Sequence, residues 1–189
     1  MNFLDWPIEQ RSLSKRMEHH RKATTLRLIG RFSAAFPEIE YDLLWDSPVV
    51  NAQAWRLGSG QHVTICGGLA RQPLITASGL ALILAHETGH HMGGLPRDPD
   101  LRWPTWQGQA DYWAASVGMP RVFGFAAEIL TLQGAKQIEA LHEVLLESDG
   151  EPDVPPETRT AIFQAGAVGK DISGLLDAAF AQMMAERAS

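Results

Sequence analysis

The sequence predicts a single α+β domain, because short β-like segments near its middle are preceded and followed by longer helical segments. The β-like segments span residues 39–45, 49–57 and 62–66. A Gly-Ser-Gly run at 58–60 predicts a hairpin turn between the last two. With 189 residues, of which 45% are hydrophobic, the chain is long enough for one domain with a core and short for two.

Helices are predicted on both sides of the β-like segments. They span residues 9–35, 76–93, 106–118 and 122–147, and a last helix follows Asp171. Thr76 or Ser78 can cap the second of these helices, and Gly93 with Gly94 ends it. The proline-rich stretch 149–158 is predicted to be a linker. The domain thus divides into an N-terminal helical region at 1–36, a core at 37–148, and a linker with a C-terminal helix at 149–189.

The composition excludes several classes of function. A formal net charge of -6 gives no global field that attracts phosphate, so nucleic acid is not an expected partner. The single cysteine, Cys66, excludes an intrachain disulfide and a thiolate metal cluster. The longest apolar run, 80–85, is far below the roughly 18 residues that indicate a membrane span, and the N-terminus lacks a secretory signal. We therefore expect a soluble, cytoplasmic protein, or an exported one if a leader has been removed.

The first predicted helix is rich in lysine and arginine. Its apolar positions include Leu13, Met17, Leu26 and Phe32. A basic amphipathic helix can make a peripheral contact with an acidic lipid or an acidic partner. A solvated face that balances the acidic C-terminal half is the commoner use of such a pattern.

The segment HETGH at 86–90 carries the chemistry that the sequence predicts. His86 and His90 are four residues apart, so on a helix both imidazoles lie on one face and can bind one ion. Glu87 is offset by about 100° from His86, which lets its carboxylate activate a metal-bound water without binding the metal. Zinc suits imidazole ligands and lowers the pKa of such a water to about 7. We therefore predict one Zn²⁺ per chain, bound by His86 and His90, with Glu87 as the catalytic base.

A resemblance to a known family rests on four runs. They are VNAQAW at 50–55, HVTICGGLARQPL at 62–74, LALILAHETGHHMGG at 80–94 and GQADYWAA at 108–115. Together they resemble the gluzincin metallopeptidases related to the CAAX prenyl endopeptidase, particularly the small soluble bacterial members. The resemblance covers roughly residues 49–116. It implies a zincin-like fold and the hydrolysis of peptide bonds, and we expect a small, mainly antiparallel sheet with the zinc helix behind an edge strand at 63–66.

The resemblance also implies a third zinc ligand on the helix after the motif. In the family, a glutamate four residues before the aspartate of the Ala-Asp pair supplies it, and here that position is Gln107 while the aspartate is Asp111. A carboxamide oxygen is a poor zinc ligand compared with a carboxylate. Asp111 is therefore the predicted third ligand, with Gln107, Glu128 or a site of two histidines as alternatives. If Asp111 does not bind the metal, we expect it to accept a hydrogen bond from a ligand imidazole.

These observations predict a zinc metalloendopeptidase whose peptide substrate adds as an extended strand along residues 63–66. The alternative is a degenerate metallopeptidase, weakened at Gln107, that acts as a peptide-binding, protein-binding or regulatory module. Glu87 argues against this alternative, because a binding module has no use for a general base.

Overall fold

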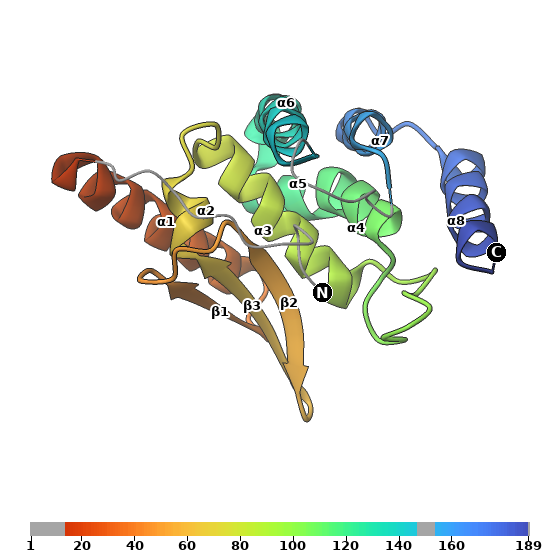
Figure 1. Ribbon diagram of the computed structural model, residues 1–189, viewed down its shortest axis with the longest axis horizontal. Coiled ribbons are helices and arrows are strands. Elements are labelled where there is room, and N and C mark those ends of the chain that lie inside the picture. Colours follow the sequence, from red (N-terminus) through yellow and green to blue (C-terminus); the bar gives the residue numbers. More distant parts are fainter. Residues whose placement is uncertain (1–13, 147–153, 189) are drawn as a thin grey trace.

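Three strands form a small mixed sheet in the computed structural model, which describes residues 14–146 and 154–188. β1 spans Ile39–Leu44, β2 spans Ala52–Leu57 and β3 spans Gly60–Cys66. β3 lies in the centre, parallel to β1 and antiparallel to β2 (Figure 1). The predicted α+β class is confirmed. The prediction of a mainly antiparallel sheet is wrong, because one of the two strand pairs is parallel.

The prediction that residues 63–66 form an edge strand is also wrong. β3 pairs with a neighbour on each side, and Val63, Thr64 and Ile65 are all buried, as expected for a central strand. Within the described part of the chain, β2 pairs only with β3, so its other edge is unpaired. The strand edge beside the HETGH helix therefore belongs to β2.

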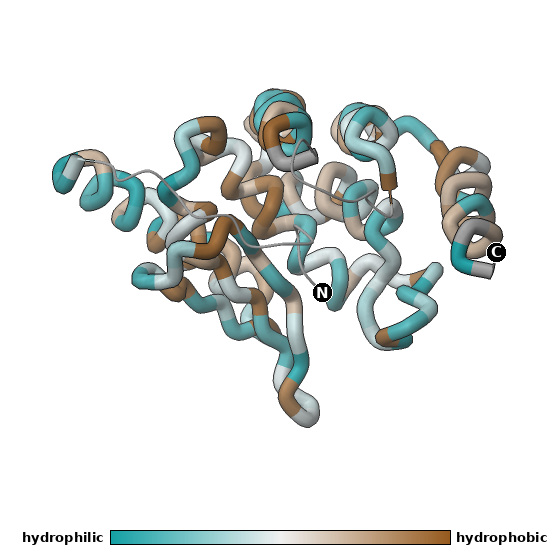
Figure 2. Tube along the Cα trace, viewed as in Figure 1, coloured by the Kyte–Doolittle hydropathy of each residue, from teal (hydrophilic) through white to brown (hydrophobic). Residues whose placement is uncertain are grey.

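The HETGH motif lies on α3, a helix that spans Ala77–Met92 and is buried from Ser78 to His91. Thr76 is the N-cap residue and Gly93 the C-cap residue, as the sequence predicts. Figure 2 shows a hydrophobic first half of the helix and a more hydrophilic second half, which carries the histidines. α3 lies between the sheet and the helices that follow it (Figure 1). Its polar half is therefore enclosed in the protein.

The other helices before residue 147 surround α3 and the sheet. They are α1 (Lys15–Ala35), α2 (Gly67–Arg71), α4 (Gln107–Trp113), α5 (Met119–Phe123) and α6 (Ala127–Leu146). The start of the predicted helix 9–35 lies outside the described residues. The predicted helix 106–118 is α4 continued by a π-helical turn at Ala114–Gly118. The predicted helix 122–147 is interrupted at Gly124, whose φ of 54° ends α5.

Gly89, inside the motif, allows α4 to pack directly on α3. A Cβ atom at this position would lie 2.9 Å from the carbonyl oxygen of Ala110, closer than real Cβ contacts allow. The close approach of the two helices places Gln107 and Asp111 of α4 beside the histidines of α3.

The C-terminal part contains two helices, α7 (Pro156–Ala167) and α8 (Ser173–Ala188). The sequence predicts α8, and Asp171 accepts a hydrogen bond from the Ser173 amide at its start. The predicted linker 149–158 is wrong from Pro156 onward, because Pro156 occupies the first turn of α7, where a proline is tolerated. α7 packs against α4 and α6, and its buried residues include Ile162 and Phe163. Among the described residues, none of the helices has the length and apolar character needed to cross a membrane.

Candidate metal centre

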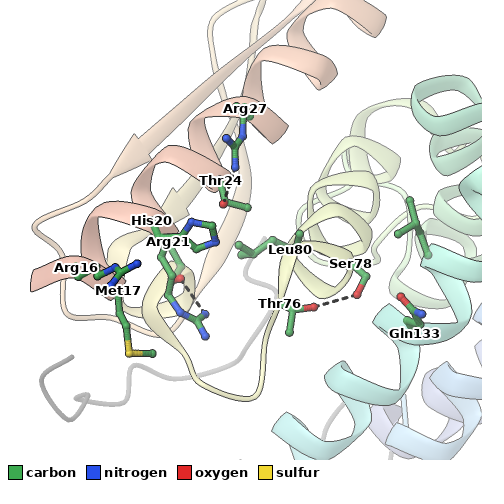
Figure 3. A pocket seen from close by; sticks show the side chains of 13 residues that line it. Arg16, Met17, His20, Arg21, Thr24, Arg27, Thr76, Ser78, Leu80 and Gln133 are labelled. Atoms are coloured by element: carbon green, nitrogen blue, oxygen red, sulfur yellow. Dashed lines mark hydrogen bonds between the residues drawn. The ribbon is translucent and has the colours of Figure 1, made fainter. Parts of the chain in front are cut away.

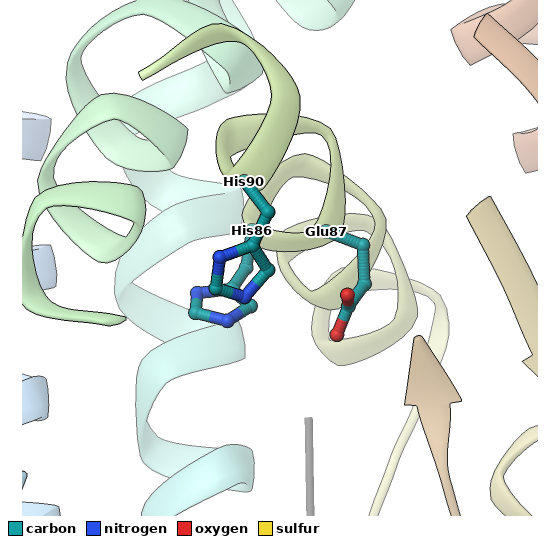
Figure 4. A group of neighbouring side chains, drawn as sticks. All are labelled: His86, Glu87 and His90. Carbon is teal, nitrogen blue, oxygen red and sulfur yellow. The ribbon is translucent and has the colours of Figure 1, made fainter. Parts of the chain in front are cut away.

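His86, Glu87 and His90 form a buried group near the C-terminal end of α3. Each of the three offers a ligating atom, and these atoms lie within 4.8 Å of one another. The two imidazole rings are 4.6 Å apart between centroids and nearly perpendicular. Figure 4 shows that all three side chains leave α3 on the same side, with the carboxylate beside the rings. All three residues have no exposed surface, so these groups are shielded from bulk solvent.

Backbone contacts orient the His90 ring. Its Nδ1 lies 2.8 Å from the carbonyl oxygen of Thr105, which can only accept a hydrogen bond, so the ring carries its proton on Nδ1. The Thr105 amide in turn donates to the carbonyl of His90 at 2.8 Å. The lone pair of the neutral ring is therefore on Nε2, which has no hydrogen-bond partner among the described residues. Burial holds the pKa of His90 well below its usual value and thus keeps the ring neutral.

A buried carboxylate orients the His86 ring in the same way. Asp111 Oδ1 lies 2.6 Å from His86 Nδ1, so the ring donates its Nδ1 proton to the carboxylate and presents Nε2 on its other side. Burial lowers the pKa of His86, which favours the neutral ring that a metal needs. Outer partners of this kind fix the tautomer and the direction of a ligand imidazole.

Arg159 of α7 compensates the charge of Asp111. Its Nε and Nη2 each donate to one carboxylate oxygen at 2.8 Å, which makes a bidentate pair. Burial alone would raise the pKa of Asp111, but the Arg159 guanidinium and His86 lower it, so the carboxylate stays charged. Nη2 also lies 3.4 Å from His86 Nδ1, and both are donors, so this is a contact and not a hydrogen bond. Asp111 and Arg159 together form the support of His86: Arg159 holds the carboxylate, and the carboxylate holds the imidazole Nδ1.

Glu87 faces the sheet edge that β2 provides. Burial raises the pKa of its carboxyl to about 8, an effect that the backbone amide of Ala54 partly offsets. Neither carboxylate oxygen has a hydrogen bond of ordinary geometry within the described chain. A buried carboxylate without such partners is costly unless a cation or a polar ligand accompanies it.

These donors fit a divalent metal ion. Zinc binds neutral imidazole nitrogen and carboxylate oxygen, and both are present within a span that one ion can bridge. His90 Nε2 has no hydrogen-bond partner among the described residues, and both buried Glu87 oxygens lack a hydrogen bond of ordinary geometry. A bound cation and its water would satisfy these atoms.

Comparison with known protein families gives a match over part of the chain. Residues 15–97 match the model of Peptidase family M48. The M48 match covers less than half of the 189 residues and includes α1, the sheet and all of α3. It supports a relationship with the M48 metallopeptidases. No curated protein and no solved structure matches the chain.

The M48 match ends before the three candidates for a third ligand. Asp111 is not in the group formed by His86, Glu87 and His90, and its oxygens face His86 Nδ1 and Arg159, which favours the supporting role over the ligand role. Gln107 is buried against His86, where it offsets a small part of the burial that lowers the pKa of the ring, although its Oε1 makes no hydrogen bond of ordinary geometry. Glu128 is exposed at the start of α6.

Two residues of the centre have no counterpart in the sequence-based predictions. Arg159 lies 48 positions from Asp111 and directly after the stretch 149–158 that the prolines led us to interpret as a linker. Thr105 contributes only its backbone, so its residue type carries no signal. A proline is common in the first turn of a helix, so Pro156 could have predicted α7, the helix that carries the buried Arg159.

Proposed function

We propose that the chain is a zinc-dependent metalloendopeptidase, in which His86 and His90 hold one Zn²⁺ and Glu87 is the general base. The observation that carries this proposal is the buried group of two Nδ1-anchored imidazoles and one carboxylate without a hydrogen-bond partner of ordinary geometry. The M48 match supports the peptidase class. The closer relationship to small relatives of the CAAX prenyl endopeptidase is part of the proposal.

Each residue of the centre has a distinct task in this proposal. Zinc, when bound, supplies Lewis acidity that polarises a peptide carbonyl. Glu87 takes a proton from the attacking water and delivers it to the leaving amine. Asp111, supported by Arg159, and the Thr105 carbonyl hold the two rings in the tautomer that binds a metal.

The peptide substrate adds to the sheet at β2 in this proposal, and not at β3 as the sequence predicts. β3 has no free edge, whereas β2 pairs on one side only among the described strands. Glu87 lies against Ala54 of β2, so a strand added to that edge would place its backbone next to the general base. Ladder hydrogen bonds would then hold the main chain of a peptide or protein substrate.

Metal removal tests the proposed activity. We expect cleavage of a mixed-sequence fluorogenic peptide library to stop after treatment with a chelator such as 1,10-phenanthroline. Activity should return when Zn²⁺ is added and not when Mg²⁺ is added, because Mg²⁺ prefers oxygen ligands to imidazole. Cleavage that continues at full rate in the chelator would show that the activity does not depend on this centre.

The position of Gln107 provides a second prediction. If the Gln107 side chain faces the metal, Gln107→Glu places a carboxylate there, and zinc affinity should rise by about tenfold or more. Competition titration with a chromophoric chelator measures the change. Gln107→Ala is the matched control and should not tighten binding. Equal affinity in wild type and Gln107→Glu would exclude this position as the source of a third ligand.

A degenerate metallopeptidase is the second candidate function, and Gln107 is the observation that favours it. A neutral carboxamide in place of a carboxylate weakens zinc binding, and a protein that has lost the metal could still hold a peptide at the β2 edge. Peptide binding without cleavage by zinc-loaded protein would support this candidate. The buried, compensated Asp111–Arg159 support and the retained Glu87 favour the enzyme.

A further inference from the structure

A cavity away from the metal centre has no role in the proposed reaction. It is a cavity of about 810 Å³ between α1, the start of α3 and α6, and Figure 3 shows the side chains that line it. Its size falls within the range of ligand-binding pockets. It shares no described lining residue with the metal centre. A function for this cavity is therefore independent of the proposed peptidase activity.

Arginines give one wall of the cavity a strong positive charge. Arg16, Arg21 and Arg27 all extend from α1 into this lining, and none of the described residues that line it is acidic. None of the three forms an ion pair with a carboxylate in the described part of the chain. From Arg16 to Arg27 the wall extends for about 16 Å along α1.

Arg21 is held in a fixed position at the centre of this wall. Its Nη1 donates to the carbonyl oxygens of Gln72 and Ile75 at 2.8 and 2.7 Å, and more weakly to that of Ala70 at 3.4 Å. These carbonyls orient the guanidinium but do not neutralise it. Arg16 and Arg27 are exposed and can adjust to a ligand. The wall therefore combines one preorganised cation with two adaptable ones.

The opposite wall is mixed, with three apolar residues beside Thr76, Ser78 and Gln133. Leu80 of α3 and Leu130 of α6 line it, together with Ala77. The amides at the start of α3 are already bound, because Gln137 Oε1 accepts hydrogen bonds from the Thr76 and Gly79 amides. Attraction for an anion thus comes from the arginines and not from the helix terminus.

We propose that this cavity binds an acidic, amphipathic peptide segment of a partner protein, with its carboxylates toward α1 and its apolar side chains toward α3 and α6. A length of about 16 Å accommodates roughly five residues of extended chain. A single-headed anion such as a fatty acid would use one arginine of the three. Nucleic acid is disfavoured, because no Phe, Tyr or Trp among the described lining residues offers a surface on which bases stack.

Fluorescence anisotropy with a short labelled peptide of alternating aspartate and leucine tests the proposal on the full wild-type chain. We expect saturable binding that weakens as salt increases, because the contacts are largely ionic. The double variant Arg16→Gln/Arg27→Gln should weaken binding at least tenfold. Both side chains are exposed, so the variant should remain folded, which circular dichroism verifies. Mass spectrometry verifies that the probe stays intact during the measurement.

The matched control is Lys15→Gln/Lys22→Gln, which removes two positive charges from the same helix outside the cavity. This variant should bind the peptide within about twofold of wild type. A peptide of alternating aspartate and serine should bind more weakly than the leucine peptide, because it leaves Leu80 and Leu130 uncovered. Equal losses in both double variants would overturn the proposal, as would equal binding of the serine peptide. Tighter binding of laurate, anionic vesicles or single-stranded DNA than of the peptide would also overturn it.

Discussion

Glu87→Gln is expected to lower kcat/KM for peptide hydrolysis by about 10²- to 10⁴-fold, which is the usual contribution of a general base. The amide has nearly the shape of the carboxyl group but cannot accept a proton from water. Both Glu87 oxygens are buried and lack a hydrogen bond of ordinary geometry with described residues, so the variant should fold normally. Zinc content should remain one per chain, because the imidazoles of His86 and His90 are unchanged. Library cleavage and elemental analysis measure the two effects separately.

The matched control for Glu87→Gln is Glu128→Gln, which neutralises an exposed carboxylate on α6. We expect this variant to cleave at the wild-type rate. If Glu87→Gln kept more than half of the wild-type activity, Glu87 would not be the base. If it instead lost its zinc, Glu87 would be a ligand and the assignment of roles would have to change.

Arg159→Met is expected to destabilise the protein by about 3–5 kcal/mol, because it leaves the buried charge of Asp111 without its cation. Arg159 donates two hydrogen bonds to this carboxylate, and both residues are buried. Zinc affinity should fall by about 10- to 100-fold, since the support of His86 is weakened. Urea unfolding of the metal-free protein and zinc competition titration measure the two losses.

Two comparisons make the Arg159 prediction specific. Arg159→Met/Asp111→Asn removes both charges, so it should be more stable than Arg159→Met alone, which a structural role of the arginine in packing would not produce. Lys136→Met removes a positive charge from the exposed surface of α6 and should change stability by less than about 0.5 kcal/mol. A free energy of unfolding for Arg159→Met within this margin of wild type would contradict the proposed role of the pair.

The sequence predicts the local features of this fold well, because they depend on neighbouring residues. The limits of α3 follow from Thr76 and Gly93, and the i, i+4 spacing of His86 and His90 places both rings on one side of that helix. The three β-like segments correspond to the three strands within a few residues.

The order of the strands was not predictable from alternation alone. Hydrophobic alternation shows which residues point inward but not which strand pairs with which. The burial of Val63, Thr64 and Ile65, which marks β3 as the central strand, is evident only in the folded structure. The substrate edge consequently moves from β3 to β2 in the proposed function.

The support of the centre was the least predictable part. The pairing of Arg159 with Asp111 joins α7 to α4 across 48 positions, and no local pattern links the two residues. The role of Asp111 depends on which nitrogen of His86 it meets, which only the packing of α4 on α3 decides. The sequence indicates a carboxylate near the histidines, and the fold places it at Nδ1 of His86, not at the Nε2 that can bind a metal.

The proposal that His86 and His90 hold one zinc ion is tested most directly by elemental analysis of purified wild-type chain, dialysed after incubation with excess Zn²⁺. We predict one zinc per wild-type chain and none in the variant His86→Ala/His90→Ala at equal, verified folding. Wild-type protein without stoichiometric metal, or equal zinc in both proteins, would contradict the proposal.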